Sequence, residues 1–328
     1  MRRRELLAGL AAIAVAGHIA RARGAGLRRI GFLTPVGFAP GSTAGRLVDA
    51  VVHALVGQGL VEGTDFAIVK RGAAAHYERL AALMAELLAE HVDVVVATSY
   101  PAALAAKQAT QSVPIVTVNT GDPVKTGLVA SLGRPGGNIT GISDVAAELA
   151  PKRLEFLKEL VPSLRRVAML WNASDLGMSL RYEATAAVAT QLGITVQSLG
   201  VREPDDFKDA FAVMEQSRPD GILMVSDTLM ILNRKRVFDF AGAHRIAAIY
   251  EDGRYAHDGG LMSYGPDASE TATRAASLVA RVLNGTQPGE LPVEQPTKFE
   301  LVINVKTAKA LGLAVPPSLL ARADEVIE

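Results

Sequence analysis

Short apolar runs rich in β-branched residues alternate with helical patterns along most of this chain. In the first half, the runs of strand length are residues 29–34, 66–70, 92–97 and 115–118. The segments between them space leucine, valine or alanine along one helical face, at residues 43–56, 77–90 and 101–110. Repeated strand–helix units predict right-handed crossovers and a parallel sheet.

The same rhythm restarts after the turn Pro135-Gly136-Gly137-Asn138 and a β-branched run at residues 139–143. A helix opening at Pro151 leads into predicted strands 167–171, 194–199, 221–225 and 247–250. The helices among them are expected at 178–192, 206–216 and 230–243, and a last helix, capped by Asp267 and Glu270, runs to residue 283. Two such series predict an α/β protein with two Rossmann-like lobes. A single eightfold (β/α) barrel is the alternative, and the Gly-rich break near Gly136 favours two lobes.

The first 24 residues have the order of an export signal. Arg2, Arg3 and Arg4 precede an apolar stretch at residues 6–16, and small residues around 20–24 offer a cleavage site. The arginine pair also resembles a twin-arginine signal, without the usual Ser or Thr before it. The alternative is an amphipathic N-terminal helix of a cytosolic protein. The segment predicts an exported, periplasmic protein whose signal peptide is removed.

The amino-acid composition limits which classes of partner the protein can have. Hydrophobic residues make up 49% of the chain and aromatic residues 5%, so the core must rest mainly on aliphatic side chains. Without residues 1–24 the net charge is near −4, which argues against nucleic acid as a partner. The chain has no cysteine, so it offers neither a disulfide nor a site for a lipid anchor. We expect no direct membrane anchor.

The usual sequence signals of enzymes and metal sites are missing. Ser263 lacks the glycine two residues earlier that a nucleophile elbow requires. Val124 stands where a phosphate-binding loop before Lys125 needs glycine. The histidines show no pairing at ligand spacing. We therefore expect no catalysis, no metal and no cofactor.

Polar and aromatic residues gather just after the predicted strands, where parallel α/β sheets bind ligands. Hydroxyls, amides and helix N-termini there can hold a carboxylate, acids can hold an ammonium, and aromatic rings can sandwich a ring. The candidate ligand-binding residues are Thr34, Phe38, Thr98, Ser99, Tyr100, Asn119 and Asp122 in the first lobe and Trp171, Asn172, Ser226, Asp227 and Glu251 in the second.

Several candidates have a purely structural alternative. Ser99 and Ser226 are also suited to cap helices, and Asp122 before Pro123 is typical of a turn. Trp171 at a strand end is typical of core packing. Asn119 and Asp122, at the leading edge of the segment 122–141, are its only site candidates, whereas residues 134–141 are better explained as architecture leading into the first crossover to a second lobe.

Long motifs in the chain resemble those of ABC-transporter substrate-binding proteins related to the tryptophan/tyrosine-binding TrpX type. They are Asp122-Pro123-Val124 with 127–129, residues 134–141, Lys152-Arg153-Leu154-Glu155, residues 260–265, and the tail 291–304 with 306–312. The resemblance implies a type I periplasmic-binding fold whose two lobes are joined by a three-strand hinge near 140–143, 261–264 and 301–304. It divides the chain into lobe 1 (27–141 plus 265–298) and lobe 2 (142–264 plus 299–328).

The resemblance also implies a function. The protein is expected to be a monomeric periplasmic solute receptor that captures a small organic ligand, an amino acid or aromatic compound, and delivers it to an ABC permease in the inner membrane. Ser99, Asn119, Asp122 and Asp227 are the implied contacts of the ligand carboxylate and amine. The alternatives are a periplasmic sensing module for a signalling receptor and an enzyme on the same fold.

Overall fold

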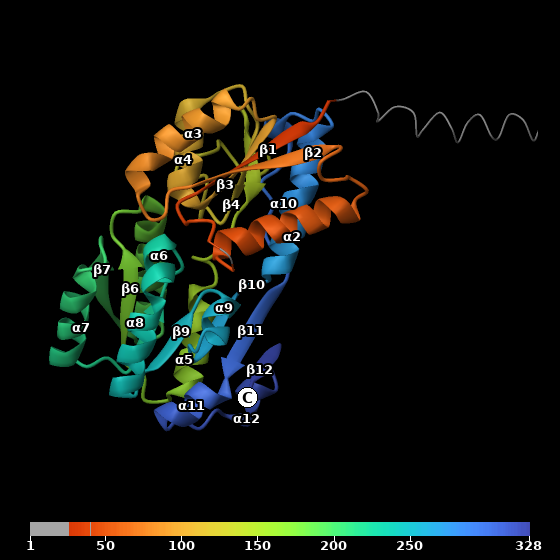
Figure 1. Ribbon diagram of the computed structural model, residues 1–328. Coiled ribbons are helices and arrows are strands. Elements are labelled where there is room, and N and C mark those ends of the chain that lie inside the picture. The colour runs from red at the N-terminus through yellow and green to blue at the C-terminus, as the bar shows by residue number, and fades with distance from the viewer. Residues whose placement is uncertain (1–25, 40) are drawn as a thin grey trace, which may run out of the picture.

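The computed structural model describes residues 26–39 and 41–328, so the predicted signal segment lies outside the described residues. Two sheets, each covered by helices, form two lobes one above the other in Figure 1. The upper lobe contains β1 (Arg28–Thr34), α2 (Thr43–Gly57), β2 (Phe66–Gly72), the 3₁₀ turn η1 (Tyr77–Arg79), α3 (Leu80–Ala89), β3 (Val94–Thr98), α4 (Ser99–Ala109), β4 (Ile115–Val118) and β5 (Ile139–Ile142). Two later segments, α10 (Ala268–Leu283) and η2 (Pro288–Glu290), return to it.

The lower lobe begins with α5 (Ala150–Leu160), β6 (Arg166–Asn172), α6 (Leu176–Gln191), β7 (Thr195–Val201), α7 (Asp206–Gln216), β8 (Gly221–Met224) and α8 (Thr228–His244). It continues with β9 (Ala247–Tyr250), α9 (Gly253–His257), β10 (Met262–Pro266), β11 (Phe299–Asn304), α11 (Val305–Leu311), α12 (Pro317–Leu320) and β12 (Glu325–Ile327). Two separate sheets confirm the predicted two-lobe α/β fold and exclude the single barrel.

Both sheets repeat one strand order. The first runs β2-β1-β3-β4-β5, and the second runs β7-β6-β8-β9-β10 before adding β11 and β12. All neighbours are parallel except β10 and β11. In each sheet the order reverses beside the lobe's first strand, so a crevice opens at the carboxyl ends of β1 and β3 in one lobe and of β6 and β8 in the other.

Strand β3 shows why the predicted apolar runs are unbroken. Val94 and Val96 join the core with α2 and α10, whereas Val95 and Ala97 join the core with α3 and α4 on the opposite face. All four side chains are fully buried. Successive strand residues point to opposite faces, so a strand covered by helices on both sides must be apolar throughout.

The chain passes between the lobes three times, after β5, after β10 and before β11. The first and third passages are joined because Ser143 N–H donates to Glu294 O (2.9 Å) and Glu294 N–H donates to Gly141 O (2.9 Å). The second and third are continuous with the antiparallel pair β10–β11. The sheets change near the predicted lobe boundaries, although the boundary at 264/265 falls inside β10, and the exact division stays a prediction.

The capping pair at α10 forms only in part. The Asp267 carboxylate accepts from Glu270 N–H (2.7 Å), as predicted. The Glu270 carboxylate, however, accepts from the N–H groups of Thr297 (3.1 Å) and Lys298 (2.8 Å) instead of returning to Asp267. The Thr297 hydroxyl and Arg274 also donate to this carboxylate, and all these bonds together lower the pKa of Glu270 to about 2, against the opposing effect of burial. Glu270 therefore fastens the third passage to the upper lobe.

Gly141, the last residue of the motif 134–141, should tolerate no side chain. Its φ is +155°, and a Cβ there would overlap the backbone and hydroxyl oxygens of Thr117 on β4. We expect Gly141→Ala to lower the free energy of unfolding by about 3 kcal/mol or more. Urea denaturation measures this, with Gly133→Ala, where nothing lies near the new methyl group, as the control. Equal stability of the two variants would contradict the account.

Candidate functional site

A cavity of about 420 Å³ lies between the lobes, where the two crevices face each other. Each wall is built from strand ends and the helices that follow them. The upper lobe contributes the N-terminal turns of α2, α4 and α10, and the lower lobe contributes the turns that open α8 and α9. A molecule that fills this cavity would therefore contact both lobes.

Seven sequence-predicted candidates line the cavity: Thr34, Thr98, Ser99, Asn119, Ser226, Asp227 and Glu251. Ser99 does not cap a helix through its side chain, since α4 begins at Ser99 itself, two residues earlier than predicted. Its φ of 68° and that of Asn119, 58°, are left-handed conformations that non-glycine residues rarely adopt. Such backbone conformations cluster at ligand sites, where surrounding structure holds them.

The other five candidates lie outside the cavity lining. Asp122 accepts from the N–H groups of Val124 and Lys125 (3.0 Å each), which is the turn considered as its alternative. Trp171 stacks on Tyr182 with ring centroids 4.9 Å apart. Asn172 donates to Asp227 Oδ2 (2.5 Å), so it acts on the cavity through another residue.

The remaining two are Phe38, which lies 6.0 Å below the Lys70 ammonium, and Tyr100, which faces Gly177 at the contact between lobes. No aromatic residue lines the cavity within the described part of the chain. Aliphatic side chains, including Leu47, Ala50 and Ile231, form its apolar wall instead. The described walls therefore do not provide the ring sandwich for which aromatic candidates were considered.

A buried ion network closes the floor of the cavity. Glu251 accepts from Arg153 Nη1 (2.9 Å), Arg181 Nη1 (2.7 Å) and Ser226 N–H (2.8 Å). Arg181 also pairs with Asp144 in the first passage between the lobes. These side chains are between 1% and 10% exposed, so solvent ions screen the pairs only weakly.

Arg153 carries the network into the hinge. Its Nε donates to Tyr264 O in β10 (2.8 Å), and its Nη1 also donates to Ala146 O (2.9 Å) beyond β5. One side chain thus joins the first and second passages between the lobes. Arg153 Nη2 and Arg181 Nε remain buried with no partner among the described residues.

The ionisation of Asp227, which lines the cavity, is altered by its burial. It caps α8 by accepting from Met230 N–H (2.8 Å) and accepts from Asn172 on its other oxygen. Burial raises the pKa of Asp227 to about 6, and the hydrogen bonds only partly oppose this. Its charge therefore changes within the range of environmental pH.

Sequence reasoning missed the arginines. Arg153 lies on the buried face of α5 together with Leu154, Leu157 and Leu160. A charged residue among the apolar positions of this face was the sequence signal that could have identified it. Arg181 lies on a stripe of α6 with Gly177 and Thr185, too weakly apolar to mark a buried face. Asp144 and Arg254 were also missed, since a passage between lobes and a five-residue helix leave little pattern.

In residues 26–39 and 41–328, no group of three or more His, Asp or Glu side chains is placed to hold a metal ion. Across the same residues, the helices are too short or too polar to cross a bilayer.

Comparisons of the sequence with known proteins agree on one family. The profile described as "ABC transporter substrate binding protein" matches residues 40–327. A tyrosine-binding protein of Clostridioides difficile is 27% identical over 262 residues, which span 80% of this chain and 75% of that protein.

Solved structures agree with this. The ABC domain from Streptococcus pneumoniae in complex with L-Trp has a TM-score of 0.85 at 26% identity, covering 92% of this chain and all of that one. A conserved domain protein from Vibrio cholerae has a TM-score of 0.84 at 24% identity, covering 91% and 99%. The likeness confirms the type I periplasmic-binding fold that the motifs implied.

Removing one charge from the buried network should be costly. Glu251→Gln leaves two buried arginines with reduced compensation, and we expect the free energy of unfolding to fall by about 3–5 kcal/mol. Asp239→Asn, which breaks an exposed pair with Lys235, should change it by less than about 0.5 kcal/mol. Chemical denaturation compares the two, and similar losses would contradict a structural role for Glu251.

Asp227 should make stability depend on pH. Because its pKa is raised in the folded state, the folded protein holds the proton more tightly than the unfolded chain, and this stabilisation is lost as the pH rises through about 6. From about pH 4 to about pH 8, the free energy of unfolding of the native protein should fall by about 2 kcal/mol more than that of the Asp227→Asn variant. Parallel pH profiles of the two unfolding free energies would contradict the shift.

Proposed function

We propose, since the chain belongs to the family of ABC transporter substrate-binding proteins, that it is the periplasmic solute-binding component of an importer. It captures a small organic ligand between its lobes and delivers it, as a monomer, to a permease in the inner membrane. Candidate ligands are amino acids and small aromatic compounds. The observation that carries the proposal is the cavity between two facing crevices, lined by charged and aliphatic side chains from both lobes.

Contacts across the cleft support a closed arrangement of the lobes. Tyr100 on α4 packs against Gly177 on α6, and Arg181 approaches the backbone of Gly121 in the upper lobe. The Tyr77 phenol of the upper lobe lies near the opening turn of α8. Burial there, followed by the charge of Asp227, raises the pKa of Tyr77. A ligand that touches both walls favours this closed state, because an open state offers contacts from one wall only.

Delivery requires that the closed state be reversible. The three passages between the lobes are short and lie side by side, so changes in a few backbone dihedral angles there can separate the lobes. The permease would then recognise the closed, loaded form. The missing enzyme motifs and the family's description as substrate-binding proteins favour transport over catalysis.

Two cysteines placed across the cleft should test closure. A Cβ at position 177 would lie 3.6 Å from the Cβ of Tyr100, within the range of about 3.5–4.5 Å that disulfides span. The chain has no other cysteine. In the Tyr100→Cys/Gly177→Cys double variant, stripped of bound ligand by unfolding and refolding, a compound that binds should speed disulfide formation.

The probes are a panel of amino acids and small aromatic compounds that includes L-tryptophan and L-tyrosine. The rate is followed by free-thiol labelling, and each single-cysteine variant serves as a control for oxidation between molecules. Native mass spectrometry should show the compound retained after oxidation. No acceleration by any member of the panel, with no retained compound, would contradict the proposed function.

A further inference from the structure

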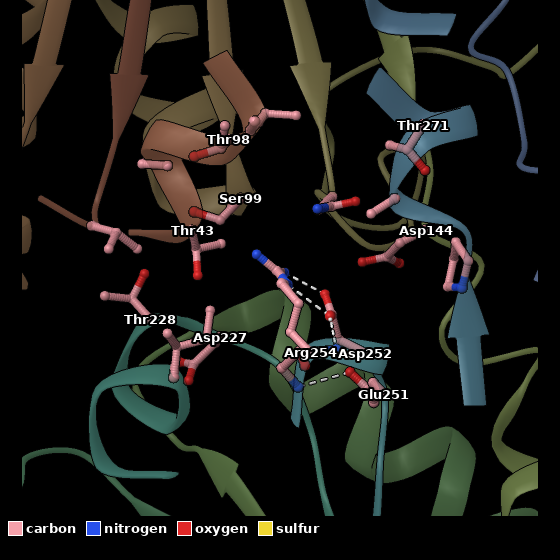
Figure 2. Close-up of a pocket in the computed structure, with 18 of the residues that line it drawn as sticks. Thr43, Thr98, Ser99, Asp144, Asp227, Thr228, Glu251, Asp252, Arg254 and Thr271 are labelled. Atoms are coloured by element: carbon pink, nitrogen blue, oxygen red, sulfur yellow. Dashed lines mark hydrogen bonds and ion pairs between the residues drawn. The ribbon is translucent and has the colours of Figure 1, made fainter. Parts of the chain in front are cut away.

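Arg254 extends from α9 into the middle of the cavity. Figure 2 shows its side chain rising from the lower lobe toward the side on which Thr43 and Ser99 of the upper lobe lie. Asp252, the N-cap of α9, holds it there by accepting from Arg254 Nε (2.7 Å), from Nη2 and from the Arg254 backbone N–H (2.9 Å). The orientation of the guanidinium is therefore fixed before a ligand arrives.

This pairing uses only one edge of the guanidinium. A guanidinium has five N–H donors, and Asp252 occupies the edge formed by Nε and Nη2. Nη1 donates to no described residue, and the side chain is 30% exposed. The edge formed by Nη1 and Nη2 is thus presented to the cavity, in the geometry that binds a carboxylate through two parallel hydrogen bonds.

The cavity has spare donors and occupied acceptors. Both oxygens of Asp144, Asp227, Glu251 and Asp252 already accept from arginines, from Asn172 or from backbone N–H groups. In contrast, the buried Arg153 Nη2 and the hydroxyls of Ser99 and Ser226 lack partners among the described residues. Hydroxyls and guanidinium groups can donate to a ligand anion, whereas every carboxylate oxygen that could receive a ligand ammonium already accepts at least one hydrogen bond.

Arg46 adds positive charge at the same end. It lies on α2 in the upper lobe and also lines the cavity. Arg254 lowers the pKa of Asp252 by charge and hydrogen bonding against the effect of burial, and Arg46 contributes to the same lowering from across the cleft. Arg46 and Arg254 thus lie on opposite sides of the cleft near the same carboxylate, at the end of the cavity where the lobes meet.

We propose that Arg254 is a specificity-determining residue that receives a carboxylate of the ligand. The inference rests on the proposed function and deepens it: the ligand is a small organic acid, and an α-ammonium group is not required for binding. The apolar part of this ligand lies against the aliphatic wall formed by Leu47, Ala50 and Ile231. Asp252 acts as a positioning residue for Arg254.

Matched compounds that differ in one group can test the proposal. Three sets share one apolar body each: 3-phenylpropanoate, its amide and L-phenylalanine; 4-methylpentanoate, its amide and L-leucine; and indole-3-propanoate, its amide and L-tryptophan. Binding to refolded full-length protein is measured by calorimetry and thermal shift. At least one acid should bind roughly 10- to 100-fold more tightly than its amide, and no more weakly than the corresponding amino acid.

Variants assign this preference to one side chain. Arg254→Gln should weaken binding of the acid roughly 10- to 100-fold and leave the amide nearly unchanged, whereas Arg254→Lys should recover part of the preference as a point charge. Arg218→Gln, which removes an exposed arginine outside the cavity, is the matched control and should bind as the native protein does.

Three outcomes would overturn the inference. The first is equal binding of each carboxylic acid and its amide, and the second is an Arg254→Gln variant that still prefers the acid to the amide. The third is binding of the amino acids without binding of any of the three acids that lack the amino group. In the last case the proposed function stands, because a small solute still binds. If none of these compounds binds, and no member of the panel of amino acids and small aromatic compounds speeds the disulfide across the cleft, both proposals fail.

Discussion

The buried network of Arg153, Glu251, Arg181 and Asp144 is the interaction on which the rest of the structure depends. Glu251 directly follows β9 and holds both arginines, while Arg153 and Asp144 extend the network to the passages between the lobes. Buried charges are expensive to desolvate and are tolerated only when paired with good geometry. The network therefore fixes where the floor of the cavity lies relative to the hinge.

That constraint explains the character of the cavity. The repeated strand order opens a crevice in each lobe, and the passages between the lobes bring the two crevices face to face. Because the floor is already neutralised by its own ion pairs, the groups left to meet a ligand are hydroxyls, the N-terminus of α4, which has no side-chain cap, and the outer edge of Arg254. The aliphatic walls then admit an apolar body of moderate size.

Much of the fold could be predicted from the sequence, because unbroken apolar runs such as Val94–Ala97 report burial on both faces of a parallel sheet. Ser99 and Asp227 could be placed at the cavity because they follow strands whose carboxyl ends meet at one edge. Asp122 comes after β4 and Trp171 lies at the end of β6, yet the Asp122 carboxylate turns back on its own loop and the Trp171 ring packs on Tyr182 of α6. Arg181 could not be identified because its position depends on contacts with Glu251 and Asp144, which are distant in the sequence. Arg254 could not be identified because the five residues of α9 are too few to show a periodic pattern.

Small-angle X-ray scattering tests the central claim most directly, namely that the lobes close on a ligand held between them. The ligand-free protein should have a larger radius of gyration than the protein saturated with a compound that binds, because separated lobes extend the molecule. A radius of gyration that stays the same on saturation, with binding verified in the same sample, would contradict the account.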